Sequence, residues 1–178
     1  SFASSKHDDL SYALASKSAT YIVGNHESWL EDLTDDQPRL EGLVGLKPLL
    51  GLDGWTVVDQ GGYHRLGKLH FIHGDQISGG TNAAKNAVDT YGQSVRLGHY
   101  HTFQTATRTS AVHNALGHTG AVIGCLCSKD PKYGHGKPNR WIQGFCYGYV
   151  DKHTGLFNDY FPIICNGRTV IDGKVYKS

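Results

Sequence analysis

The chain has 178 residues, 39% of them hydrophobic, so it is long enough to bury one core and to fold as one domain. Its net charge of +1 with histidine neutral argues against attachment to nucleic acid or to a membrane surface by bulk charge. No apolar run approaches the roughly 20 residues that cross a bilayer, and residues 1–6 lack the apolar stretch of a signal peptide, so we expect a cytoplasmic protein.

The first fifty residues predict one strand among several helices. Asp8 and Asp9 are typical helix caps, and the apolar residues after them predict a helix to about residue 17. Tyr21–Val23 is a short apolar run ending at Gly24, which predicts a buried strand. Polar residues from 27 to 39 and spaced leucines from 40 to 50 then predict two or three short helices.

Residues 55–97 predict strands around a single helix. Glycines separate three runs rich in β-branched and aromatic residues, so we expect three strands lying beside one another, at residues 55–58, 63–66 and 68–72. The segment 83–91 predicts a helix closed by Gly92, and residues 94–97 predict the next strand.

From Gln104 onward the pattern changes to strand after strand. The clearest runs are residues 121–123, 144–150 and 160–164. Helix–strand alternation followed by strands alone predicts an α/β fold with a strand-rich, largely antiparallel C-terminal half.

All four cysteines lie in this second half, at Cys125, Cys127, Cys146 and Cys165. Because no secretion signal is visible, we expect reduced thiols that behave as small buried side chains. One residue separates Cys125 from Cys127, whereas common zinc knuckles have two between their cysteines, so the spacing favours plain thiols over a zinc site.

Three segments place histidine or asparagine beside a glycine directly after a predicted strand: residues 24–27, 73–75 and 98–101. Side chains at such positions project into the crevice at the carboxyl ends of the strands, where open α/β sheets build their sites. Taken singly, a histidine at a strand end is more often structural than a ligand. Four imidazoles and one amide together suit Mn, Fe, Zn or Ni. His99 and His101 would point the same way if their segment is extended.

In their order and spacing these segments resemble the calcineurin-like metallophosphoesterase family, whose signature includes Gly-Asn-His-Asp/Glu, a later histidine and Gly-His-x-His. The match runs from Gly24 to His101. Residues 124–127 and 138–145 also look like the branch of this family common in bacteriophage genomes. The resemblance implies the α/β sandwich of that family and a hydrolase, either a phosphatase or a phosphodiesterase.

The resemblance also implies a centre of two divalent metal ions, with no organic cofactor. Asn25, His73 and His99 would bind one ion, and His101 would bind the other. The ions expected from these ligands are Mn, Fe, Zn or Ni. Together they would clamp a phosphate monoester or diester, such as a nucleotide or a nucleic acid, and deliver a metal-bound hydroxide.

Three further residues receive roles from the same resemblance. His26 would be the catalytic residue that stabilises or protonates the leaving oxygen, held in place by Glu27 or another carboxylate. Asp75 would orient the metal ligand His73, although a surface salt bridge is the plainer explanation of that carboxylate.

The family's two opening motifs, Asp-x-His and Gly-Asp-x-x-Asp, do not occur in this sequence. We therefore expect residues 1–178 to be one metallophosphoesterase domain that is incomplete at its N-terminus, with little activity alone, because its remaining predicted ligands are neutral. The edge at Tyr21–Val23 should be covered by a second chain, another copy, or the missing segment.

Two other functions stay open at this point. The chain could be a catalytically impaired structural or interaction module with the same fold, which the absent carboxylates favour. It could also be a protein that binds a single ion through Asn25, His73 and His99.

Overall fold

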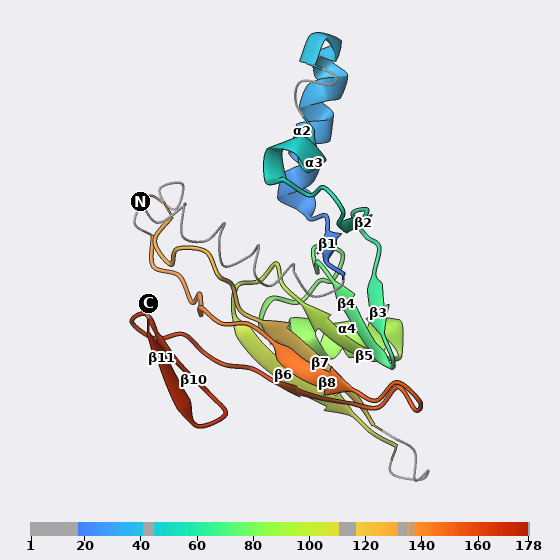
Figure 1. The fold of residues 1–178 in the computed structure, drawn as a ribbon, viewed down its shortest axis with the longest axis vertical. Coiled ribbons are helices and arrows are strands. Elements are labelled where there is room, and N and C mark those ends of the chain that lie inside the picture. Colours follow the sequence, from blue (N-terminus) through green and yellow to red (C-terminus); the bar gives the residue numbers. More distant parts are fainter. Residues whose placement is uncertain (1–17, 41–44, 111–116, 132–134, 136, 178) are drawn as a thin grey trace. The chain divides into compact units, whose positions relative to one another are not determined.

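The computed structural model describes residues 18–40, 45–110, 117–131, 135 and 137–177. They belong to two compact units, one that ends at Gly62 and one that begins at Tyr63. The fold is mixed α/β, with few helices and several sheets, as the sequence predicts at this level (Figure 1). The helix expected after Asp8 lies outside the described residues.

The first unit contains a parallel pair of strands with helices between them. Strand β1 (Thr20–Ile22) pairs with β2 (Thr56–Val58), and Tyr21 lies opposite Val57. Between them come α2 (Asn25–Asp36), the 3₁₀ helix η1 (Pro38–Leu40) and α3 (Leu46–Leu50). The expectation that residues 55–58 lie beside the following strands is wrong, because a helical crossover returns β2 to β1.

The second unit is built on a five-stranded mixed sheet in the order β3-β4-β5-β7-β6. Strands β4, β5 and β7 are parallel, while β3 and β6 run antiparallel at the two edges. The bounds are β3 His64–Leu66, β4 Leu69–Ile72, β5 Ser94–Leu97, β6 Phe103–Arg108 and β7 His118–Ile123. The strand predicted over residues 94–97 is confirmed.

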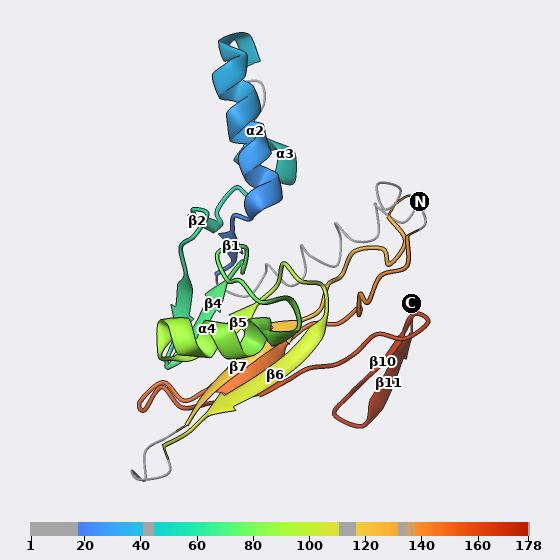
Figure 2. The ribbon, with the colours of Figure 1, turned by 180° about the vertical axis from the view of Figure 1, so that it is seen from behind.

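Helix α4 (Ala83–Tyr91), preceded by the 3₁₀ helix η2 (Gly80–Asn82), covers one face of this sheet (Figure 2). It ends at Gly92, whose φ of 59° is left-handed, so the predicted helix and its stop are confirmed. Its buried side chains are mostly alanines, which allow a close approach to the sheet. A side-chain carbon at Gly120 of β7 would lie 2.1 Å from the Ala84 carbonyl oxygen, so glycine is required there.

The other face of the sheet carries the hairpin of β8 (Tyr147–Val150) and β9 (Phe157–Tyr160). Arg96 of β5 is only 2% exposed, and its guanidinium pairs with Asp159 of β9. The same guanidinium lies 5.5 Å from the ring centres of Phe157 and Phe161. Buried charge, aromatic packing and hydrogen bonds thus hold the hairpin on the sheet.

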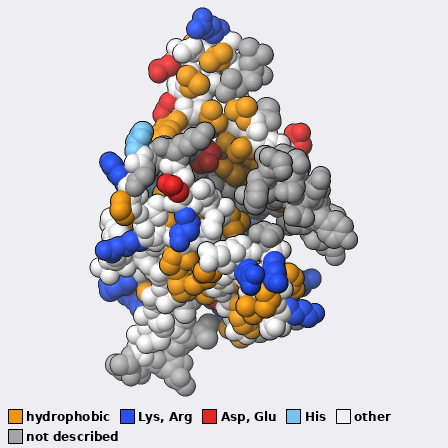
Figure 3. Space-filling model, turned by 90° about the vertical axis from the view of Figure 1, so that its left-hand side faces the viewer, with side chains coloured by type: hydrophobic (Ala, Val, Ile, Leu, Met, Phe, Trp, Pro, Cys, Tyr) orange, Lys and Arg blue, Asp and Glu red, His pale blue; other side chains and the backbone are white. Residues whose placement is uncertain are grey.

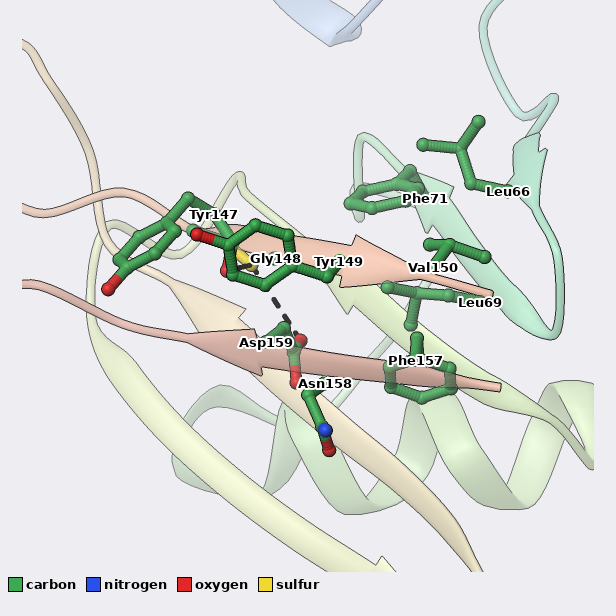
Figure 4. A pocket seen from close by; sticks show the side chains of 11 residues that line it. Leu66, Leu69, Phe71, Tyr147, Gly148, Tyr149, Val150, Phe157, Asn158 and Asp159 are labelled. Carbon is green, nitrogen blue, oxygen red and sulfur yellow. Dashed lines mark hydrogen bonds between the residues drawn. The ribbon is translucent and has the colours of Figure 1, made fainter. Parts of the chain in front are cut away.

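A cavity of about 210 Å³ lies between this hairpin and strands β3 and β4. Figure 4 shows Leu66, Leu69 and Phe71 near Val150 and Phe157 at one end of it. These side chains make that end of the cavity apolar.

The strand predicted over residues 160–164 is wrong, because the paired strand is β9 and ends at Tyr160. Pro162 has no N–H to donate to a ladder, and after it an isolated bridge, not a strand, joins Ile163 to Gly144. A further hairpin follows, made of β10 (Arg168–Ile171) and β11 (Lys174–Lys177).

None of the helices in the described part of the chain is long and apolar enough to cross a membrane.

Candidate metal centre

Two predicted ligands meet where the inner strands β4 and β5 of the second unit's sheet end. Strands β4 and β5 are parallel neighbours with Ile72 opposite Leu97, so the residues that follow them emerge side by side. The Gly98 N–H donates to the His73 carbonyl at 2.9 Å. The ring centroids of His73 and His99 lie 5.3 Å apart at an interplanar angle of 68°. The two imidazoles therefore share one site at the carboxyl ends of these strands.

The segment 98–101 is bent, so the condition under which His99 and His101 would point the same way, an extended segment, is not met. Both histidines have left-handed backbones, with φ of 58° and 57°. The Tyr100 N–H donates to the Gly98 carbonyl at 2.6 Å, which closes a tight turn. Such conformations cost roughly 1–3 kcal/mol in residues other than glycine and gather at functional sites.

This turn gives the two histidines different neighbours. The His99 ring faces His73 and also the Tyr100 ring, at 5.0 Å between centroids. The His101 ring packs edge-on against Trp141 at 4.3 Å, and its Nδ1 lies 4.0 Å from the Cys127 Sγ. In the described part of the chain, His101 thus faces a different set of side chains from the pair at 73 and 99.

Tyr100 fastens the turn to the loop that follows β4. Its hydroxyl donates to the Ile77 carbonyl, and Ile77 is buried in the core under α4. Burial raises the pKa of the Tyr100 phenol, so it stays a neutral donor at physiological pH. The half-buried Asp75 lies in the same loop, two residues after His73, and its predicted role in orienting His73 stays a prediction.

Asn25 and His26 lie in the first unit, at the start of helix α2. His26 is exposed, and its ring lies 4.9 Å from the ring of Trp29. The Glu27 carboxylate accepts hydrogen bonds from the Gly24 N–H at 2.9 Å and the Tyr21 hydroxyl at 3.0 Å. Glu27 therefore caps the helix, a role that the sequence analysis missed although Glu three residues after the cap position is its usual signal.

The Glu27 carboxylate affects the pKa of the Tyr21 phenol. Burial first, and the hydrogen bond with Glu27 second, raise the pKa of Tyr21 well above its ordinary value. The predicted contact that would hold His26 through Glu27 stays a prediction.

A second group of possible ligands surrounds His101. One ligand atom from each of His101, Cys125 and Cys127 lies within 4.8 Å of the other two. Burial, followed by the hydrogen bond with Cys127, raises the pKa of the Cys125 thiol to about 11. None of the four cysteines forms a disulfide. The sequence analysis favoured plain thiols over a zinc site at Cys125 and Cys127. It missed His101 as a third possible ligand, since pairing between distant segments brings it to the two cysteines.

Backbone hydrogen bonds tie the three segments around this cluster to one another. The Gly124 N–H donates to Thr102 at 2.9 Å, and the Ile142 N–H donates to His101 at 2.8 Å. The Cys125 N–H donates to Ile142 at 3.0 Å and its carbonyl accepts from Gly144 at 2.9 Å. A side-chain carbon at Gly124 would lie 2.6 Å from the Ile142 carbonyl oxygen, so this close approach requires glycine.

No family model, curated protein or solved structure matches the chain. The chemistry of the centre is therefore derived from its own residues. They offer imidazole at positions 73 and 99, and imidazole with thiols at positions 101, 125 and 127, which are ligand types that transition metals prefer.

Proposed function

We propose that this protein is a metal-dependent phosphoesterase, with the α/β sandwich that its motifs resemble. The observation that carries the proposal is the pair His73–His99, with ring centroids 5.3 Å apart where the parallel strands β4 and β5 end. The left-handed backbone of His99 supports it, since strain at a histidine indicates a position kept for its side chain.

Within the proposed centre, His73 and His99 would hold one divalent ion. The roles that the motif resemblance gives to Asn25, as a further ligand of this ion, and to His101, as the ligand of a second ion, stay predictions. A bound metal such as Mn²⁺ would supply Lewis-acid activation of the phosphate ester and of the attacking water. His73 and His99 follow the ends of the paired strands β4 and β5, and this backbone would fix the geometry of the two imidazole ligands. The resemblance also assigns to the exposed imidazole of His26 the donation of a proton to the leaving oxygen of a phosphate monoester or diester, and this role stays a prediction.

Mn²⁺ binding tests the proposed centre directly. Loss of free Mn²⁺ signal in electron paramagnetic resonance measures binding to the 178-residue chain and to His73→Ala and His99→Ala. Each variant should weaken binding at least tenfold, because each removes one imidazole ligand. His153→Ala, which removes an exposed histidine between β8 and β9, is the matched control and should bind as the parent does. Equal binding by all four proteins would refute the centre.

Hydrolysis of an aryl phosphate and of an aryl phosphodiester tests the reaction. Asn25, His73, His99 and His101 are neutral donors, whereas two divalent ions also need anionic ligands, so we expect slow turnover that His99→Ala removes. Turnover unaffected by His99→Ala would exclude this centre as its source. Mn²⁺ binding through His73 and His99 with no turnover above that of His99→Ala would favour the single-metal protein.

An interaction module is the second candidate, because the first unit exposes large apolar side chains on its helices. Trp29 is 63% exposed and Leu49 is 55% exposed. Figure 3 shows hydrophobic side chains on the surface in the upper part of the view, where α2 lies. Among the described residues, β1 pairs with β2 on one side and with no strand on the other. The expectation that another chain, another copy or a further segment covers Tyr21–Val23 stays a prediction. Sedimentation velocity distinguishes this candidate: Trp29→Gln should abolish any self-association that the parent shows.

A further inference from the structure

We propose that His101, Cys125 and Cys127 form a binding site for one thiophilic divalent ion such as Zn²⁺. Zinc binds thiolate sulfur at about 2.3 Å and imidazole nitrogen at about 2.0 Å, so tetrahedral ligands lie about 3.6 to 3.8 Å from one another. The three ligand atoms here are already within 4.8 Å of one another. A contraction of about 1 Å by side-chain rotation completes the geometry.

The backbone around this site is held before any ion binds. Hydrogen bonds join residues 101–102 to 124 and 142, and residue 125 to 142 and 144. The Gln143 side chain also donates to the Cys127 carbonyl at 2.9 Å. Ligands on such cross-linked segments lose little conformational freedom on binding, which favours a site over a chance cluster.

The ring of His101 is oriented by its neighbour and by its own backbone. Trp141 packs edge-on against it at 4.3 Å between centroids, and the φ of His101 is 57°. These contacts direct its Nδ1 to within 4.0 Å of the Cys127 sulfur. The left-handed backbone of His101 therefore helps to aim its Nδ1 at the cysteine sulfur.

The charge and exposure of the ligands favour zinc in an open site. Two thiolates cancel the charge of a divalent ion, which neutral imidazoles alone do not. Cys127 is exposed, so solvent reaches the site and water would complete a four-coordinate ion. The proposed phosphoesterase centre also assigns His101 to an ion, so this residue would serve one of the two sites. Cys125 and Cys127 belong to the zinc site alone, which does not depend on the phosphoesterase function.

Cobalt binding tests the site by spectroscopy, with no measurement of activity. The reduced 178-residue chain is titrated anaerobically with Co²⁺, and thiolate coordination gives a near-ultraviolet charge-transfer band. We expect a band that saturates at one equivalent and disappears when Zn²⁺ is added. Cys125→Ser and Cys127→Ser should each weaken binding at least tenfold, while Cys165→Ser, the exposed-cysteine control, should keep the band.

Two further variants separate this site from the proposed phosphoesterase centre. His101→Asn should weaken Co²⁺ binding while keeping a residue that tolerates a left-handed backbone. His73→Ala should leave the band unchanged even though it weakens Mn²⁺ binding, so each proposal can fail alone. Circular dichroism confirms that the variants fold. The proposal is overturned by the absence of a thiolate band, by a band that survives both Cys125→Ser and Cys127→Ser, or by its loss in Cys165→Ser.

Discussion

Removal of the Asp159 carboxylate should destabilise the second unit strongly. The side chains of Arg96 and Asp159 are 2% and 11% exposed. Arg96 Nη2 donates to Asp159 at 3.0 Å and to the Thr119 hydroxyl at 2.9 Å, while Nη1 donates to the Thr119 carbonyl at 2.7 Å. Asp159→Asn keeps the shape of the side chain but leaves a buried guanidinium without its counter-charge.

The expected loss is about 3 kcal/mol of unfolding free energy, the lower end for breaking one partner of a buried ion pair. The retained hydrogen bonds of Arg96 to Thr119 keep the loss at that end. With an m-value of about 2 kcal/mol per molar urea, the unfolding midpoint should fall by roughly 1.5 M.

Urea unfolding followed by far-ultraviolet circular dichroism measures this change. Asp89→Asn is the matched control: its carboxylate pairs with Lys85 at 2.7 Å, but that pair lies on the surface, so its midpoint should hardly move. The reasoning is wrong if Asp159→Asn shifts the midpoint no more than Asp89→Asn does.

Two other substitutions probe single positions. Gly124 and Gly173 share a φ of 76°, but only at Gly124 would a new side-chain carbon meet backbone, 2.6 Å from a carbonyl oxygen. Gly124→Ala should therefore lower the urea midpoint clearly more than Gly173→Ala, and similar shifts would show that the contact relaxes at no cost. Glu27→Ala should cost about 1 kcal/mol through the lost helix cap. It should also lower the pKa of the Tyr21 phenol, because the hydrogen bond with Glu27 is lost. That pKa should stay above its ordinary value, because burial is the larger cause. An ultraviolet titration measures the change, with substitution of the exposed Asp35 (Asp35→Ala) as the control.

Elements defined by local pattern could be predicted from the sequence. The small apolar residues of α4 recur at helical spacing, and Gly92 follows the helix, so the local pattern predicts both the helix and its stop. The short segment after Gly92 likewise predicts strand β5, and the structure buries all four of its residues. The meeting of His73 and His99 follows from parallel strands that end together, which glycines after each strand signal.

Pairing between distant segments could not be read in the same way. No local sequence pattern predicts that β2 pairs with β1. Nor does any local pattern predict the backbone β-bridge between Cys125 and Gln143, which brings Cys125 close to His101. The hairpin of β10 and β11 was missed although Asp172-Gly173, with φ of 49° and 76°, is a usual two-residue turn. The bend that separates His99 from His101 has no sequence signal, because left-handed histidines are uncommon.

Those two left-handed histidines have a consequence for protein engineering. Glycine or asparagine would fit the backbone at positions 99 and 101 with less strain, so a library selected for thermal stability alone should gather these residues there. The resulting variants would unfold at higher temperature and bind metal more weakly. A stability screen that uses no substrate would therefore mark the proposed metal ligands by the histidines that it discards.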